Sequence, residues 1–354
     1  MKKIICLLMV CLLVIGCSVT LTGCKQYDGE INVYNWGEFI SDGTDGSMNV
    51  IAEFEAKYNI KVNYTTYETN ETLYNILSSS NSSYDVIIPS DYMVEKLIAE
   101  GLVQEINFDN IPNYKNVMDE YKGMDFDPEN KYSVPYSWGV VALGYNKSMV
   151  NGEIKGFSDL WREDLSGNIL MFNNSRDAMA IAMQLTGGNP TNATKEDIDK
   201  AYDKLLEQKP LVKKYVMDMV FSELEGSQAA IAPYYAGDIY TMMSNNEDLA
   251  YCLPEEGSNL FVDSMCIPTC AKNKDGAEKF INFMLEAEVA KANAEYIGYS
   301  TPNKAAFDIL PEEMKQNELI YPPQEYLDKC YTFANLSEEV YNYMQEKFID
   351  VLAE

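Results

Sequence analysis

Between residues 31 and 101 the sequence alternates three times between a short β-rich segment and a segment of helical spacing, and this order is its strongest constraint on the fold. Strands that alternate with helices predict a parallel sheet with right-handed crossovers, because a right-twisted strand followed by a helix packs back onto the sheet only in that hand. The chain is therefore expected to be an α/β protein. The predicted strands are 31–35, 60–64 and 84–88, and the predicted helices are 48–58, 70–77 (with Asn70 as its N-cap) and 94–100.

Aromatic and acidic residues directly follow two of these strands. Trp36 and Glu38 come after strand 31–35, and Tyr92 comes after strand 84–88. Ligands of open α/β sheets bind beyond the carboxyl ends of the strands. An aromatic face attracts a cation and a carboxylate neutralises it, so these positions predict a site for an organic cation. The alternative is structural, with Trp36 and Tyr92 at the edge of the core and Glu38 solvated.

A second α/β unit follows an extended passage at 132–145, which has too many β-forming residues to be a loose linker. With 354 residues, the chain exceeds what one hydrophobic core usually organises, so two lobes are expected. The further predicted elements are strands 167–172 and 229–232, a hairpin of 249–254 with 260–268, and helices starting at 157, 178, 195, 239, 277 and 337.

The start of the chain predicts export and a lipid anchor. Two lysines precede an apolar run over 4–15, which fits a signal peptide and is too short for a permanent membrane span. Leu-Thr-Gly-Cys at 21–24 resembles the bacterial lipobox, whereas the sequence before Cys17 is a poorer match. We predict a lipoprotein signal peptide at 1–23, a lipidated Cys24 with a tether over 24–30, and a protein on the extracytoplasmic face of the cell membrane, periplasmic where an outer membrane exists. The alternative is a plain secretory signal.

The charge balance favours cationic ligands. Without residues 1–23 the chain keeps 25 of its 27 basic residues and all 55 acidic ones, so it repels nucleic acid and attracts cations at long range. The chain has no histidine, the commonest general base and zinc ligand. We therefore expect neither catalysis, nor a cofactor, nor a metal site, nor nucleic-acid binding. The alternative source of the acidity is the solubility that an exported protein needs.

Four cysteines besides Cys24 remain in the predicted mature chain: Cys252, Cys266, Cys270 and Cys330. They are too few for a disulfide scaffold and form no CxxC pair. We expect them mainly to be small buried hydrophobes. One disulfide, from Cys252 to Cys266 across the predicted hairpin, stays open.

Five short motifs fall in the order and spacing of one known family. They are Tyr-Asn-Trp-Gly-Glu at 34–38 and the segments 84–92, 134–139, 262–268 and 297–303. On these motifs the mature chain resembles the spermidine/putrescine-binding proteins of bacterial polyamine ABC transporters, in their lipoprotein form. The resemblance implies a periplasmic-binding-protein-like (type II) fold, with two α/β lobes, a hinge and a ligand cleft between the lobes. The lobes would comprise 31–136 plus 265–302 and 137–264 plus 303–354.

The resemblance also implies a monomer that captures a polyamine, closes about its hinge and delivers the ligand to ABC permease subunits. Tyr235 and Phe261 stand at positions where family members commonly have Trp, and Asp238 matches an acid of putrescine-type members. Asn174 departs from the pattern, since spermidine-type members carry Asp there, and a late glutamine has no clear counterpart near 330–333. The implied ligand-binding residues are Trp36, Glu38, Tyr92, Asp177, Tyr235, Asp238, Phe261, Asp263 and Tyr299.

Physical chemistry supports such a set, because each buried ammonium needs a carboxylate and each methylene segment needs an apolar wall. The structural alternatives are that Asp177 caps a helix, that Asp263 is a charge at a sheet edge and that Tyr299 lies at the core rim. Two competing functions use the same residue types. The first is a ferric-iron binder that uses Tyr234 and Tyr235 with carboxylates, and the second is a hydrolase with paired carboxylates.

Overall fold

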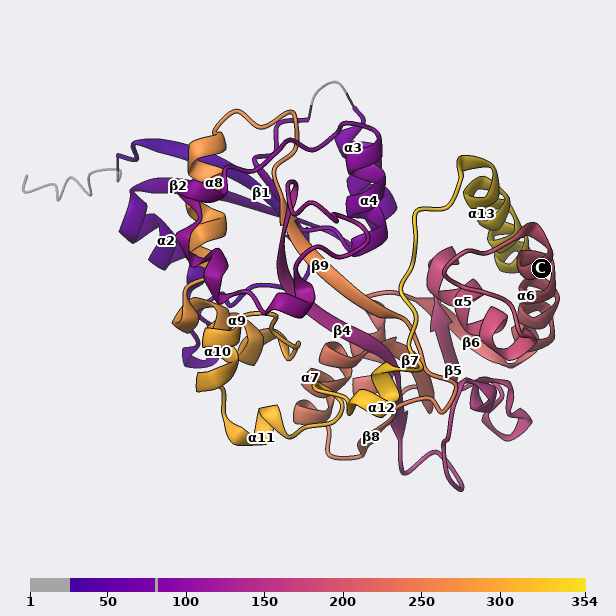
Figure 1. Cartoon of the computed structure of the whole chain (residues 1–354). Coiled ribbons are helices and arrows are strands. Elements are labelled where there is room, and N and C mark those ends of the chain that lie inside the picture. Colours follow the sequence, from indigo (N-terminus) through magenta and orange to yellow (C-terminus); the bar gives the residue numbers. More distant parts are fainter. Residues whose placement is uncertain (1–25, 80–81) are drawn as a thin grey trace, which may run out of the picture.

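The computed structural model describes residues 26–79 and 82–354, so Cys24 and the predicted signal peptide lie outside the described residues. A mixed sheet runs through both halves of the molecule (Figure 1). Its strand order is β2 (Ile60–Tyr67), β1 (Gly29–Trp36), β3 (Val86–Ile87), β9 (Leu260–Cys266), β4 (Ser133–Asn146), β7 (Ile231–Tyr235), β5 (Ile169–Phe172) and β6 (Val212–Val216), and β8 (Leu249–Cys252) also pairs with β4.

The first unit has the predicted parallel order, with β1 between β2 and β3. Helices α2 (Val50–Tyr58), α3 (Asn70–Leu77) and α4 (Asp91–Ala99) follow these strands in turn. The predicted N-cap of α3 is wrong. Thr69 is the N-cap, since its side chain accepts a hydrogen bond from the amide of Thr72. β1 begins at Gly29, so the last two residues of the predicted tether belong to the sheet.

The predicted passage at 132–145 is β4, a strand of 14 residues that is buried over nearly its whole length. Its first part pairs with β9, from Ser133 opposite Cys266 to Val140 opposite Leu260, and its second part pairs with β7 and β8. β9 in turn reaches β3, where Ile87 lies opposite Cys266. Continuous backbone pairing therefore joins the two halves of the molecule (Figure 1).

The predicted hairpin of 249–254 with 260–268 is wrong. β8 and β9 each pair with β4, at 143–146 and 133–140 respectively, because β4 is long enough to offer each strand its own stretch. Cys252 and Cys266 form no disulfide, because both are free thiols, as are Cys270 and Cys330.

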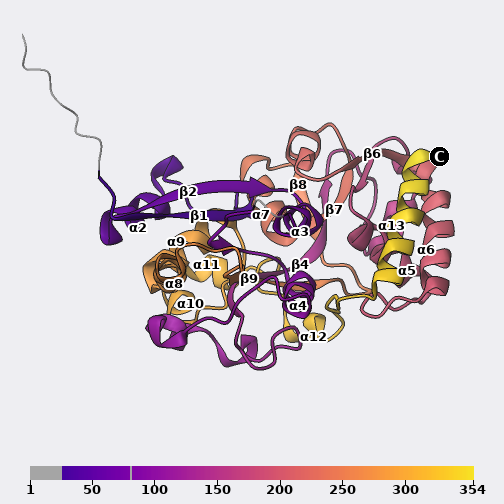
Figure 2. The same cartoon turned by 90° about the horizontal axis from the view of Figure 1, so that it is seen from above.

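Two main hydrophobic cores lie on the two ends of the sheet. In the first, α8 (Lys274–Met284) and α9 (Ala287–Ile297) pack with α2 beside β1. In the second, α5 (Ser175–Thr186), α6 (Lys195–Gln208) and α13 (Glu338–Ala353) lie side by side (Figure 2). Along β4, buried side chains up to Tyr136 belong to the first core, and those from Val140 onward belong to the second. The lobe boundaries themselves stay a prediction.

Several short elements were not predicted, because segments of four to six residues carry too little periodicity. They are α10 (Lys304–Ile309), α11 (Glu312–Lys315) and α12 (Gln324–Leu327). α10 packs on α9, a helix of the first core. The sequence prediction instead assigns residues from 303 onward to the second lobe. The sequence prediction also missed α9 and the lysine-bearing β6, and the helix predicted from 157 is a 3-10 turn. Of the described residues, none belongs to a helix long and apolar enough to cross a membrane.

Phe280 on α8 tests the first core. Its side chain is fully buried, and its ring lies 5.1 Å from that of Phe54, edge to face. We expect Phe280→Ala to lower the free energy of unfolding by about 3–5 kcal/mol, since it leaves a cavity that the packed helices cannot fill. Denaturant unfolding followed by circular dichroism measures this. Ile349→Ala on the exposed face of α13 is the control and should change stability by less than about 0.5 kcal/mol. An equally small effect at Phe280 would contradict the packing.

Candidate functional site

A cleft lies where the two cores meet, and its walls come from both. The empty space between its walls, counted together with adjoining open solvent, is about 840 Å³. The residues that follow β1, β2, β3, β5 and β6 line it, together with the end of β7 and the inner face of β9. The carboxyl ends of parallel strands are the expected place for a ligand in such a sheet.

Most of the predicted ligand residues line this cleft. They are Trp36, Tyr92, Asp177, Tyr235, Asp238, Phe261, Asp263 and Tyr299. Glu38 is the exception, and its part in ligand binding stays a prediction. Its backbone is left-handed, with φ of 49°, and the turn carries its exposed side chain into a second, more open hollow. That hollow meets the cleft at Gly37, Asp218 and Asp238, and we call this junction the mouth of the cleft. Glu38 lines the hollow and not the cleft.

Asp177 lies in the first turn of α5 and faces the cleft. The helix is capped by Asn174, whose side-chain oxygen accepts a hydrogen bond from the Asp177 amide at 2.8 Å. The Asp177 carboxylate instead accepts hydrogen bonds from Asn174 Nδ2 and from the Tyr235 hydroxyl, both at 2.9 Å. Burial raises the pKa of Asp177 to about 6, against the effect of these two donors. The capping alternative is therefore wrong, since Asn174 performs that function.

Asp238 lies in the first turn of α7 (Ala236–Asn245) and accepts a hydrogen bond from the Tyr299 hydroxyl at 3.0 Å. Burial raises the pKa of Asp238 to about 7, and the charges of Asp218 and Glu38 add to the shift. Gly237 makes this contact sterically feasible. A Cβ at Gly237 would lie 2.1 Å from the Tyr299 ring, so any larger residue would displace the tyrosine from the carboxylate.

Asp263 on β9 is buried and accepts a hydrogen bond from the Ser90 hydroxyl at 2.7 Å. Burial raises the pKa of Asp263 to about 7. Beside it lies Asp91, which is only 2% exposed. Asp91 Oδ1 accepts a hydrogen bond from the Tyr92 amide, whereas Oδ2 has no partner of hydrogen-bond geometry, although the Val262 amide is near enough to favour the charged form. Burial raises the pKa of Asp91 to about 7 as well.

Aromatic rings form the apolar walls between these carboxylates. Phe261 stands between two tyrosines, with ring centroids 5.4 Å from Tyr235 and 6.2 Å from Tyr299. Near the end of β1, the ring of Trp36 lies 4.5 Å from that of Tyr67. The cleft therefore alternates carboxylates with ring surfaces.

Sequence reasoning missed five charged residues of the cleft: Glu68, Glu71, Asp91, Arg176 and Asp218. Asp91 falls within the motif at 84–92, and Arg176 adjoins the predicted residue Asp177. Asp218 follows β6, a strand that the sequence prediction omitted together with its loop.

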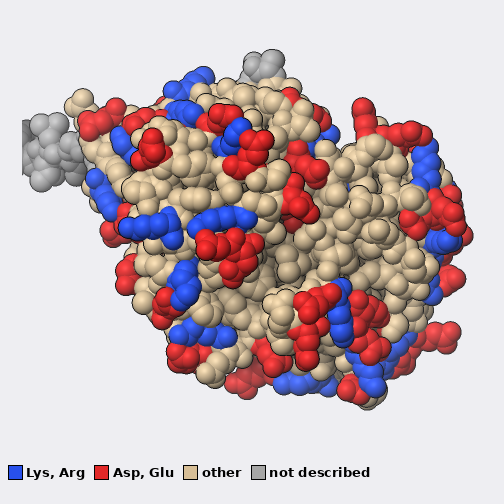
Figure 3. Space-filling view, viewed as in Figure 1, with Lys and Arg blue, Asp and Glu red and all other residues tan. Residues whose placement is uncertain are grey.

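The cleft carries a large excess of negative charge. On the face of the molecule in Figure 3, acidic and basic side chains are interspersed. Among the described residues that line the cleft, Arg176 is the one basic residue. The acidic lining residues are Glu68, Glu71, Asp91, Asp177, Asp218, Asp238 and Asp263. Carboxylates separated by aromatic walls suit a ligand whose positive charges are separated by apolar segments.

The tyrosine pair considered for iron does not converge on one point. The Tyr234 hydroxyl lies 3.5 Å from Asp218, whereas the Tyr235 hydroxyl donates to Asp177. Within the described ranges, no group of three or more His, Cys, Asp or Glu residues is arranged to hold a metal ion.

Comparison with known proteins gives consistent matches. Residues 49–322 match the family model described as bacterial extracellular solute-binding protein. The chain is 33% identical over 298 residues to the spermidine/putrescine-binding periplasmic protein of Salmonella typhimurium, covering 84% of each chain. It is 27% identical to the putrescine-binding periplasmic protein PotF of Escherichia coli, covering 85% of each chain.

Solved structures are similar over nearly the whole described chain. A protein of Listeria monocytogenes is 35% identical with a TM-score of 0.86, over 91% of this chain and 98% of that one. The spermidine/putrescine ABC transporter substrate-binding protein PotD of Streptococcus pneumoniae is 32% identical with a TM-score of 0.78, over 92% of this chain and 99% of that one. The periplasmic-binding-protein-like fold predicted from the sequence is confirmed.

The raised pKa values of the cleft carboxyls predict how the stability of the ligand-free protein depends on pH. A carboxyl whose pKa rises on folding, from roughly 4 to about 6 or 7, stabilises the fold only while it is protonated. We expect the free energy of unfolding to fall between about pH 5 and about pH 8, by at least about 1.4 kcal/mol, the equivalent of one pKa unit in one group.

Denaturant titrations at several pH values measure this slope. Asp238→Asn removes one of the contributing groups and should flatten the slope. The surface variant Asp164→Asn should leave the slope unchanged, because ion pairing with Arg162 lowers the pKa of Asp164 out of this window. Stability that rises with pH over this range would contradict the assignment.

Proposed function

Because the chain belongs to the bacterial extracellular solute-binding protein family, we propose that it captures polyamines, putrescine and spermidine, in the cleft and delivers them to an ABC importer. One observation carries the proposal. Carboxylates that are largely removed from water stand between aromatic rings, and their charge exceeds that of the single guanidinium beside them. The names of the relatives supply the chemical class that fits this arrangement, an alkyl chain with several ammonium groups.

Each group has a defined task in this function. Asp177, Asp238 and Asp263 each accept hydrogen bonds from an ammonium, which replaces the lost water. Tyr235 and Phe261 pack on the methylenes and attract the charged ends. Asp177 and Asp238 belong to helices at the second core. Asp263 instead accepts a hydrogen bond from Ser90, which lies beside the first core. A ligand held between them favours the closed form of a two-lobed protein.

The finer assignments belong to the same proposal. The protein acts as a monomer without catalysis, with lobes 31–136 plus 265–302 and 137–264 plus 303–354. Cys24 carries the lipid that holds it at the extracytoplasmic face of the membrane, beside the permease. Ferric-iron binding is the weaker alternative, because Tyr234 and Tyr235 contact different carboxylates.

Calorimetric titration with putrescine and spermidine tests the proposal. The protein from residue 25 onward, stripped of ligand, should bind at least one of them with one-to-one stoichiometry. At about pH 8, where the cleft carboxyls are ionised, we expect Asp263→Asn to weaken this binding at least about tenfold, because it leaves a buried ammonium without its carboxylate.

Asp164→Asn is the control for that variant, since it makes the same chemical change on the surface. Its affinity should match that of the unmodified protein. Unchanged affinity in Asp263→Asn would remove Asp263 from the site, and folded protein that binds no polyamine would overturn the proposed function.

The lipid anchor has its own test. In cells that express the full chain, Cys24→Ala should move the protein from the membrane fraction to the soluble or secreted fraction, because the acceptor of the lipid is lost. Cys17→Ala changes the poorer lipobox candidate and should leave the protein in the membrane fraction. If Cys17→Ala releases the protein instead, or if neither variant does, Cys24 is not the lipidated residue.

A further inference from the structure

Arg176 occupies an unusual position for a cation in a buried site. Its side chain is 5% exposed, and its guanidinium carbon lies 4.5 Å from the ring centroids of both Tyr92 and Phe333. These two rings meet edge to face, with centroids 5.9 Å apart, so the guanidinium fills the angle between them. Nη2 donates to the carbonyl of Ala334 at 2.7 Å, whereas Nε has no hydrogen-bond partner.

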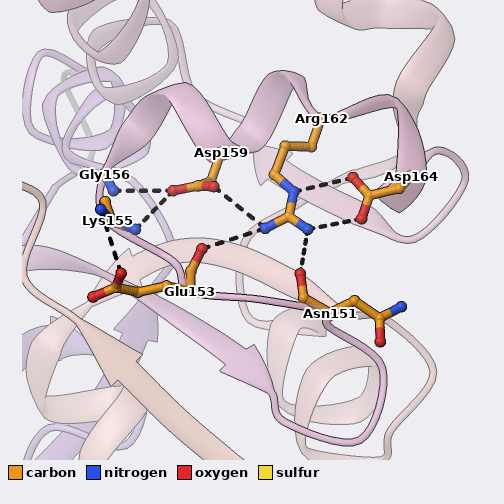
Figure 4. A network of polar contacts seen from close by, with 7 residues as sticks. All are labelled: Asn151, Glu153, Lys155, Gly156, Asp159, Arg162 and Asp164. Atoms are coloured by element: carbon orange, nitrogen blue, oxygen red, sulfur yellow. Dashed lines mark hydrogen bonds and ion pairs between the residues drawn. The ribbon is translucent and has the colours of Figure 1, made fainter.

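The charge of Arg176 is not neutralised by an ion pair. In the part of the chain that the structure describes, no carboxylate oxygen lies within 4.0 Å of its guanidinium. The chain has one other arginine, Arg162, and it differs in this respect. Arg162 lies in a surface network, with Asp164 at 2.7 Å and Asp159 at 3.4 Å (Figure 4). Since an arginine side chain stays protonated, Arg176 presents a fixed positive charge to the cleft.

Arg176 is not among the residues that the cleft shares with the open hollow. The cleft meets the open hollow at Gly37, Asp218 and Asp238. The charges acting on Asp238 are those of Asp218, Glu38 and Asp263, whereas Arg176 acts on Asp91 and, together with Glu71, on Asp177. A ligand that enters at the mouth and extends through the cleft therefore approaches the guanidinium with its leading ammonium.

We propose that Arg176 sets an upper limit on ligand length. Its guanidinium occupies the space between the rings of Tyr92 and Phe333, and its positive charge repels an additional ammonium of the ligand there. The inference rests on the proposed function and names the substrate class within it: short polyamines, with the tetraamine spermine excluded. A short ligand satisfies the carboxylates nearer the mouth without reaching the guanidinium. A longer ligand must place an ammonium beside a charge of the same sign in a site with little water, where such repulsion is weakly screened.

The test compares putrescine and spermine by calorimetry at one ionic strength. In Arg176→Gln we expect the affinity for spermine to rise at least about tenfold relative to that for putrescine, because one like-charge contact disappears. Arg162→Gln makes the same change in the surface network and should leave the ratio at its original value. Arg176→Lys keeps the charge but loses the planar group, and should also keep the original ratio.

The outcomes separate the two proposals. If the unmodified protein binds no polyamine, the proposed function fails. If it binds putrescine and the ratio in Arg176→Gln stays within about twofold of the original, or moves toward putrescine, Arg176 does not select length. An equal loss for both ligands would mean that Arg176 only supports the cleft, and this also overturns the inference. If circular dichroism shows that Arg176→Gln is unfolded, Arg176→Met, which keeps an unbranched side chain between the rings, takes its place with the same expected ratio.

Discussion

Backbone pairing between β4 and β9 is the constraint on which the rest of the structure depends. The two strands run antiparallel from one core to the other, and each also pairs with strands of one half of the molecule. The pairing also fixes the middle of the cleft, because Phe261 and Asp263 lie on β9 opposite Gly139 and Ser137. A Cβ at Gly139 would lie 2.9 Å from the Phe261 ring, so glycine at this point of β4 lets the ring lie against the strand.

The cleft has a large electrostatic cost, and its hydroxyl groups offset only part of it. Tyr235, Tyr299 and Ser90 each donate one hydrogen bond to a carboxylate of the cleft. Such a donor stabilises the charged form, but a neutral hydroxyl does not cancel the charge, and burial still raises the pKa of each acid. The ligand-free protein therefore retains unfavourable charge that a cation would relieve, which is how sites built for binding commonly reduce stability.

The sequence was informative where local pattern and packing agree. The alternation over 31–101 predicted β1 to α4 because each element carries its own periodicity, and strand ends placed Trp36 and Tyr92 at the ligand edge. Local sequence pattern does not show which distant strands pair. The sequence therefore predicts a hairpin of β8 with β9, whereas both strands pair with β4. The direction of a side chain in a turn was equally hidden. Glu38 matches the family motif, yet its left-handed backbone turns it out of the cleft.

The same buried charges connect ligand binding to protons. A cation beside a carboxylate favours its ionised form, so an ammonium must lower the pKa of Asp177, Asp238 and Asp263 from the raised values they have without ligand. At a pH near or below those values, binding then releases protons. Because linkage is reciprocal, protons must oppose the ligand to the same extent, and affinity falls as the pH drops through about 7. In the proposed function, the burial of these carboxylates would thus make the affinity for a polyamine depend on the acidity outside the cell.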